Sequence, residues 1–180
     1  MTSRERVIRT LTFKSPDRAP RDLWALAGVG MLRRAELDDM RERYPSDFTG
    51  ADVRYGVSPR TKGTPAEVGE YTDEWGCVWS VAEIGVCGEV KRPPLEDWSQ
   101  LASYQPPWEL LDDADFRQVD ASCAAADKFV RQGTGVRPFE RLQFLRGTEN
   151  LLMDLAWQPA EFLKLCEMLH DFFLRELEMW

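Results

Sequence analysis

A long apolar face at the carboxyl end constrains the fold of this 180-residue chain more than any other feature. Between Pro159 and Trp180, large apolar side chains recur at helical spacing, namely Phe162, Leu165, Leu169, Phe172 and Phe173. This recurrence predicts a helix with one buried face, and Pro159 suits its beginning. No glycine, proline or polar tail marks its end. We therefore expect the chain to be the first part of a longer protein.

Apolar runs alternate with amphipathic stretches in the amino-terminal third of the chain. Thr2 and Glu5 have the spacing of a capping box, which predicts a short helix over residues 3–11. The apolar run at residues 23–27 ends at glycines and favours a buried strand. Residues 31–44 mix leucine and methionine with charges, as an amphipathic helix does. The order is strand followed by helix.

The middle of the chain continues this order with one interruption. Residues 47–55 are a weaker strand candidate, and residues 58–69 are rich in turn-forming residues and predict a loop. Aromatic and β-branched residues split by glycines predict a twisted hairpin over residues 70–92. Residues 112–131 favour a helix, and residues 136–145 alternate enough to suggest a strand.

Together these segments predict an α/β fold made of about three strand–helix units with an inserted hairpin. An open sheet of three parallel strands would leave an unpaired edge and uncovered helix faces. A closed (β/α)₈ TIM barrel typically needs about 250 residues. We therefore expect a partial barrel, its N-terminal half, as one truncated domain over residues 1–180 with a β-hairpin insertion at residues 70–92.

Composition excludes several classes of partner. The formal net charge of −8 and the pI near 4.8 disfavour nucleic acid as a partner.

Hydrophobic residues make up 43% of the chain without any run long enough to cross a membrane, which predicts a soluble globular protein. The polar amino end lacks the apolar core of a secretory signal, so a cytoplasmic location is expected. Four cysteines without CxxC spacing suggest reduced thiols.

Several motifs resemble the uroporphyrinogen decarboxylase superfamily. The most specific is GVRPFERLQFLRGTENLLMD at residues 135–154, which is similar to a stretch of decarboxylase-like members. The opening SRERVI and SPDRAP, at residues 3–8 and 15–20, resemble the short helix and turn before the first barrel strand. DEWG at residues 73–76 and PLEDW at residues 94–98 follow in the same order. The resemblance implies a (β/α)₈ barrel fold and covers nearly the whole chain.

The superfamily includes metal-free porphyrinogen decarboxylases and methyltransferases that use zinc with a corrinoid. The decarboxylases carry an arginine-rich MRQAGRY motif after the first strand, where this chain reads WALAGVG over residues 24–30. Their catalytic aspartate has only loose counterparts here, Asp47 and Asp52. The methyltransferases use a His-x-Cys pair, whereas the single histidine here, His170, precedes Asp171 and a phenylalanine. We therefore expect no cofactor bound by this chain alone, with zinc and a corrinoid belonging to the full-length parent.

One group of candidate substrate-binding residues falls in two places, near the end of the second expected strand and in the expected hairpin. Asp52 and Arg54 would lie toward the catalytic face, because barrel sites gather at the carboxyl ends of strands. Asp73 and Trp75 lie in the hairpin, where a carboxylate beside an aromatic ring suits substrate contact. The alternative for the hairpin pair is a solvated acid beside a tryptophan that packs on the core.

A second group of candidates lies in the family-like segment, at Glu140, Arg141, Gln143 and Arg146. Charged groups on a buried strand must be paired or must face a cavity, since burying a lone charge is costly. A pocket role and a structural ion pair are both open for Glu140 and Arg141. Arg146 precedes an expected helix start at Thr148, where it has a structural alternative as well.

Three functions remain open. The parent protein transfers a methyl group between a corrinoid or methylated small molecule and a thiol acceptor, with a corrinoid protein as partner. Alternatively it is a porphyrinogen-type decarboxylase acting on a tetrapyrrole-type substrate, which needs clustered cations to hold the carboxylates. The third option is a non-catalytic half-barrel that covers its open edge as a homodimer. In the first two cases the parent is an enzyme, and these 180 residues alone are expected to be inactive.

Overall fold

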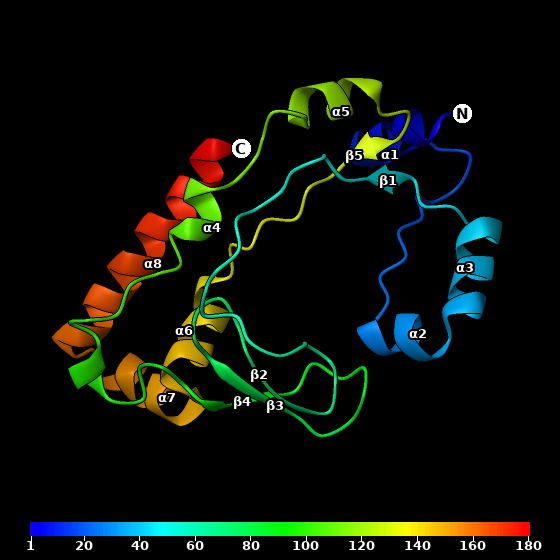
Figure 1. The fold of residues 1–180 in the computed structure, drawn as a ribbon. Coiled ribbons are helices and arrows are strands. Elements are labelled where there is room, and N and C mark those ends of the chain that lie inside the picture. Colours follow the sequence, from blue (N-terminus) through cyan, green and yellow to red (C-terminus); the bar gives the residue numbers. More distant parts are fainter. The chain divides into compact units, whose positions relative to one another are not determined.

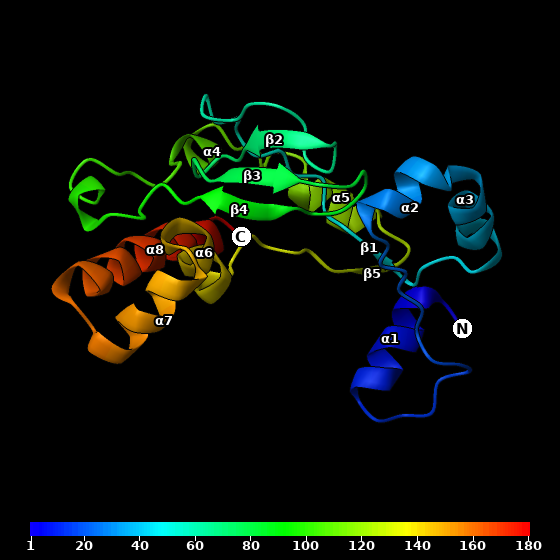
Figure 2. The same ribbon diagram turned by 90° about the horizontal axis from the view of Figure 1, so that it is seen from below.

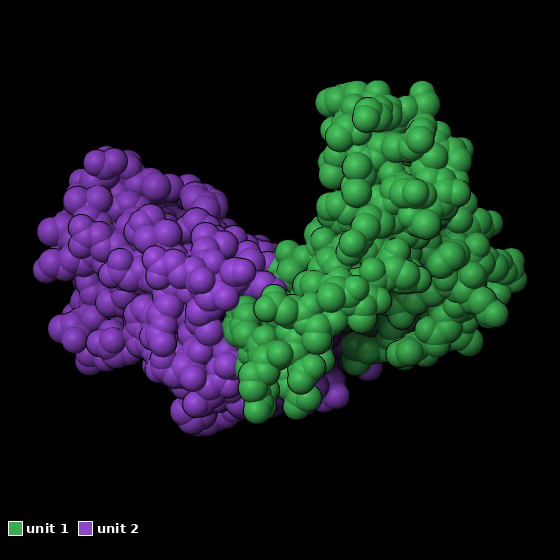
Figure 3. All heavy atoms as spheres, turned by 90° about the horizontal axis from the view of Figure 1, so that it is seen from above, with its two compact units in different colours: residues 1–54, 115–133 green, residues 55–114, 134–180 purple.

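The computed structural model describes residues 1–180, which form a mixed α/β structure without a closed barrel. The chain divides into two compact units, coloured separately in Figure 3. Unit 1 comprises Met1–Arg54 and Asp115–Gly133, and unit 2 comprises Tyr55–Ala114 and Thr134–Trp180. No helix is long and apolar enough to span a membrane.

Unit 1 consists of short elements, which Figure 1 labels along the chain. They are α1 (Ser3–Leu11), α2 (Ala27–Leu32), α3 (Arg34–Arg43), β1 (Phe48–Thr49), α5 (Val119–Ala125) and β5 (Phe129–Val130). The predicted capping box is confirmed: the Thr2 hydroxyl accepts from the Glu5 amide, and the Glu5 carboxylate accepts from the Thr2 amide. β1 and β5 pair in parallel, and the rings of Phe48 and Phe129 meet edge to face.

A buried carboxylate organises unit 1. The Asp47 side chain is fully buried and accepts hydrogen bonds at 2.6–3.0 Å from four residues, Ser3, Arg6, Arg18 and the backbone amide of Arg21. Burial by itself would raise the pKa of this carboxyl, but the hydrogen bonds outweigh it and hold the pKa below its usual value. Asp47 therefore stays ionised and ties α1 to the segment before β1.

Three expectations for unit 1 need correction. Residues 23–27 form no strand, because no neighbouring strand pairs with them, and the Trp24 side chain is exposed. The helix expected over residues 31–44 is split into α2 and α3 at Arg33, whose φ of −136° is not helical. The helix expected over residues 112–131 is replaced by short pieces, including α5 and β5. Local apolar pattern does not supply the hydrogen-bond partners that a strand requires.

Unit 2 combines an antiparallel sheet with helices. Its elements are β2 (Gly69–Thr72), β3 (Val78–Val81), β4 (Glu89–Arg92), the 3₁₀ helix η1 (Trp98–Gln100), α4 (Glu109–Asp112), α6 (Pro138–Arg146), α7 (Thr148–Trp157) and α8 (Ala160–Met179). Figure 2 shows β3 between β2 and β4. The region expected to be a hairpin, residues 70–92, thus has three strands.

The strand expected at residues 136–145 is wrong, because this segment is the helix α6. Pro138 stands in its first turn, and Leu142 and Leu145, three positions apart, are buried on one side. Gly147 separates α6 from α7 and has a φ of +79°, a conformation that glycine adopts without strain. The helix start expected at Thr148 is confirmed, with Gly147 as the N-cap of α7.

The apolar core of unit 2 forms around α8, whose predicted buried face is confirmed. Phe162, Leu165 and Leu169 pack there with Leu145 of α6 and Leu151 of α7. The core contains thirteen residues in all. At about 25 cal/mol for each Å² of apolar surface removed from water, such burial is the main stabilising contribution to this unit.

Candidate functional site

The turn between β2 and β3 forms one wall of the candidate site. Asp73 Oδ1 accepts hydrogen bonds from the backbone amides of Trp75 and Cys77 at 3.0 and 2.8 Å. This pattern is typical of aspartate at the start of a turn. Gly76 follows with a φ of +84°, which closes the turn. The DEWG sequence therefore places Glu74 and Trp75 at the tip of the turn.

Arg141 reaches this turn from α6. Its guanidinium donates to Asp73 Oδ2 at 3.2 Å and lies 3.7 Å from Glu74 Oε1. The same group lies over the Trp75 ring, with its carbon 4.6 Å from the ring centroid, in a cation–π arrangement. Asp73 Oδ2 also accepts from the Trp79 indole at 3.0 Å. Two carboxylates and an aromatic face thus hold the guanidinium.

Glu176 forms the opposite wall from α8 and is 3% exposed. Its Oε1 accepts hydrogen bonds from the Tyr55 hydroxyl at 2.9 Å and from the Gly135 amide at 3.0 Å. Burial raises the pKa of Tyr55. The hydrogen bond from the Trp180 indole lowers this pKa, and the hydrogen bond to the Glu176 carboxylate raises it further. The Tyr55 phenol therefore stays protonated at neutral pH and remains a donor to Glu176.

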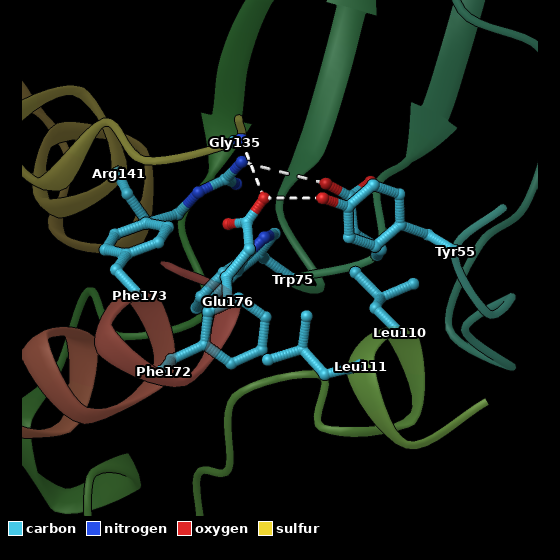
Figure 4. A pocket seen from close by; sticks show the side chains of 10 residues that line it. Tyr55, Trp75, Leu110, Leu111, Gly135, Arg141, Phe172, Phe173 and Glu176 are labelled. Carbon is cyan, nitrogen blue, oxygen red and sulfur yellow. Dashed lines mark hydrogen bonds and ion pairs between the residues drawn. The ribbon is translucent and has the colours of Figure 1, made fainter. Parts of the chain in front are cut away.

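These side chains surround a cavity of about 160 Å³, shown in Figure 4. Its polar lining comprises Tyr55, Glu74, Arg141, Glu176 and the backbone of Gly135. The apolar lining comprises Trp75, Leu110, Leu111, Phe172 and Phe173. An apolar cavity with a few convergent polar groups is the usual form of a small-molecule site.

The charge of this site is negative. Asp73, Glu74 and Glu176 contribute carboxylates, and Arg141 contributes the one guanidinium among the cavity's lining residues. Asp73 and Glu74 already compensate the positive charge of Arg141, so this side chain attracts an anionic ligand only weakly. A neutral or cationic ligand therefore suits the cavity better than a polyanion.

The structure brings together some of the predicted site residues and separates others. Trp75 and Arg141 line the cavity, and Asp73 contacts Arg141 from the turn. Glu140 is half-exposed and pairs with Arg137 at 3.1 Å, while the Gln143 amide donates to Thr148 Oγ1 at 2.9 Å. Both lie on α6 but do not line the cavity. Their expected placement on an inner strand was wrong, because α6 is a helix.

Asp52 and Arg54 belong to unit 1, and neither lies in a helix or a strand. The Asp52 amide donates to Ser122 Oγ at 3.0 Å. Arg54 forms an isolated antiparallel bridge with Asp115 through its backbone. These contacts hold loops together within unit 1.

Arg146 has a structural role. Its side chain is 5% exposed and pairs with Asp154 of α7 at 2.7 Å. It also donates to the carbonyl oxygens of Leu95 and Glu96, and its guanidinium carbon lies 3.8 Å from the centroid of the Trp98 ring. These contacts join α6 and α7 to the segment before η1, and they leave Arg146 far from free to bind a ligand.

Sequence reasoning missed Glu176 and Tyr55 as site residues. A signal for Glu176 was present, because it lies three and four positions after Phe173 and Phe172 and so shares their buried helix face. A carboxylate on an apolar face points to a hydrogen-bonded or ligand-contacting group. No comparable signal marked Tyr55, whose contact with Glu176 joins residues 121 positions apart.

Metal binding finds no support in the donor sets of this chain. No group of three or more His, Cys, Asp or Glu side chains is placed to hold an ion. Cys77 is fully buried, and burial raises the pKa of its thiol, whereas Cys87 is exposed. The two do not form a shared site of metal-binding type. His170 is exposed on α8.

Comparison with known proteins gives no relative. No family model matches the chain, no curated protein is significantly similar to it, and no solved structure matches its fold.

Proposed function

We propose that this chain is the N-terminal part of a uroporphyrinogen decarboxylase-like (β/α)₈ barrel, and that its parent transfers a methyl group to a thiol. The methyl donor would be a corrinoid or a methylated small molecule. Support comes from the resemblance of residues 135–154 to that superfamily and from the parallel pairing of β1 with β5, the arrangement of barrel strands. The cavity in unit 2 would be the small-molecule site.

The single observation that carries the choice of reaction is the negative charge around the cavity. A porphyrinogen decarboxylase must hold several substrate carboxylates, which requires unpaired arginine or lysine side chains. Here Glu74 and Glu176 line the cavity, and Arg141 contacts Asp73 and Glu74. Repulsion from these carboxylates disfavours a polyanionic substrate. Methyl transfer is therefore favoured over porphyrinogen decarboxylation.

In methyl transfer, a thiolate sulfur attacks the methyl carbon, and the bond from that carbon to the donor breaks with its electron pair on the donor. The resemblance implies zinc for the methyltransferase branch, but the donor sets of this chain do not fit it, so no step is assigned to a metal. The residues of this chain would bind and orient the small molecule and keep water away from it. The apolar side chains of Phe172, Phe173 and Leu111 line the cavity and would exclude water from it.

The test is an assay of the complete reading frame that contains this chain. The purified protein is incubated with methylcobalamin and a thiol, and thioether formation is followed by mass spectrometry. We expect thioether formation that depends on both protein and thiol. Carbon dioxide release from a porphyrinogen, without any thioether, would contradict the proposal and support the decarboxylase instead. The 180-residue chain serves as the control and is expected to be inactive.

A further inference from the structure

We infer that the cavity in unit 2 binds a small alkylammonium ion that carries at least one N–H group. This inference rests on the proposed function and deepens it, because it names the chemical class of the methylated small molecule. The expected ligand places its N–H against Glu176 and its alkyl groups against the apolar wall. Nothing in the resemblance to other proteins specifies such a ligand.

The first observation is an unused acceptor on a buried side chain. Both hydrogen bonds to Glu176, from Tyr55 and from Gly135, go to Oε1 (Figure 4). Oε2 accepts no hydrogen bond from the protein, although the residue is only 3% exposed. Oε2 is not fully enclosed, since no completely buried side-chain oxygen lacks a partner. Leaving a largely buried carboxylate oxygen without a hydrogen-bond donor is energetically costly, so a ligand that supplies a donor is favoured. A charged donor gives the stronger hydrogen bond.

The second observation is the aromatic surface beside this acceptor. Phe172 and Phe173 line the cavity next to Trp75, whose ring lies 4.8 Å from that of Phe172. Arg141 already covers a face of Trp75, so the two phenylalanine rings are the aromatic surface left for alkyl groups, beside Leu110 and Leu111. Aromatic rings attract cations through their negative faces, and recognition of alkylated ammonium groups is a known use of this attraction.

Size and charge restrict the ligand further. The cavity volume of about 160 Å³ is close to the roughly 150 Å³ of an apolar cavity that holds benzene, so the ligand has about four to seven heavy atoms. The carboxylates of Glu74 and Glu176 exceed the charge of Arg141, so a monocation lowers the repulsion between them. Trimethylammonium, with four heavy atoms and one N–H, satisfies both restrictions.

The test is a titration of the 180-residue chain with three probes of similar shape, followed by ¹H–¹⁵N NMR. Trimethylammonium carries charge and an N–H, tetramethylammonium carries charge alone, and tert-butanol is neutral. We expect trimethylammonium to bind at least tenfold more tightly than either of the others. The reporting signals are the Gly135 amide, which donates to Glu176, and the Trp75 amide in the turn.

Variants connect the affinity to the carboxylate. Glu176→Gln keeps an oxygen that accepts from Tyr55 and Gly135 but removes the charge, and we expect it to abolish the tenfold preference. Glu178→Gln on the same helix is the matched control, because Glu178 is exposed, and it should leave the affinity unchanged. Should Glu176→Gln fail to fold, Glu74→Gln in the half-exposed turn is expected to weaken trimethylammonium binding several-fold.

Two outcomes would overturn the inference. Equal binding of trimethylammonium and tert-butanol would mean that the cavity selects shape and not charge. An absence of shifts at Gly135 and Trp75 with every probe would mean that the cavity admits none of them. Neither outcome decides the proposed function, because thioether formation by the complete reading frame is measured separately.

Discussion

The interiors of the two units are built from different chemistry. Unit 1 buries four residues, and two of them, Arg6 and Asp47, are an ion pair; the others are Val7 and Leu37. Unit 2 buries a cluster of thirteen apolar residues around α8. Unit 1 also leaves large apolar side chains in contact with water, with Phe13 98% exposed.

This difference determines which conditions weaken each unit. Apolar burial is insensitive to pH, whereas a buried ion pair needs both partners charged. A buried charge whose partner is removed is costly, while the pair itself stabilises only modestly. The stability of unit 1 should therefore depend on Asp47 and on pH. The stability of unit 2 should depend on how well its apolar side chains pack.

The largest effect is expected from a cavity in unit 2. Leu145→Ala removes a side chain with no exposed surface and should lower the free energy of unfolding of unit 2 by about 2–5 kcal/mol. Urea unfolding followed by tryptophan fluorescence measures this, because Trp24 is the only tryptophan in unit 1. Leu152→Ala, at a 58% exposed position of α7, is the control. Equal losses in both variants would contradict the comparison.

Asp47→Asn is expected to lower the free energy of unfolding of unit 1 by about 3 kcal/mol, because Arg6 and Arg18 then lose a buried, charged partner. The readout is the labelling rate of Cys123, which lies in unit 1 and should react faster in Asp47→Asn. Asp39→Asn breaks an exposed pair with Arg43 and should leave the rate unchanged. A variant that shifts only the tryptophan signal would show that Asp47 stabilises unit 2 instead.

Acid should weaken unit 1 before unit 2. Hydrogen bonding to Arg6 lowers the pKa of Asp17 to about 2, and the pKa of Asp47 is lowered as well. A carboxyl whose folded-state pKa is depressed stabilises the fold above its unfolded value of about 3.9, and this contribution is lost as pH falls from about 4 toward 2. Labelling of Cys123 with a disulfide reagent that reacts in acid should accelerate in that range.

The same acid titration on Asp47→Asn should show a smaller change in labelling rate between pH 4 and pH 2, because one of the carboxyls whose pKa is lowered in the folded state is gone. If the tryptophan signal of unit 2 changed at higher pH than Cys123 labelling does, the assignment of acid sensitivity to unit 1 would be wrong.

The smallest effect is expected from an exposed ion pair in unit 2. Glu70 pairs with Arg92 across the sheet at 2.8 Å, and both side chains are more than half exposed. Solvent screens such pairs and side-chain ordering offsets their attraction. Glu70→Gln should therefore leave the urea midpoint of unit 2 unchanged within error. A shift comparable to that of Leu145→Ala would mean that surface charge matters as much as packing in this unit.

Local pattern predicted the elements that depend on neighbours in sequence. The capping box at Thr2 and the buried face of α8 both follow from residues within a few positions of one another. The errors at residues 23–27 and 136–145 concern segments that could be strand or helix by periodicity. A strand forms only where another strand pairs with it, and that information lies elsewhere in the chain.

The amino-acid sequence by itself determined the acidic charge, the position of the capped first helix and the apolar face of the last one. It also singled out Asp73, Trp75 and Arg141, although not their contact. Only the tertiary structure decided that Arg141 lies on a helix against the turn and that Glu176 meets Tyr55 from 121 positions away. The physical reason is that periodicity acts over a few residues, whereas a cavity is defined by side chains that only folding brings together.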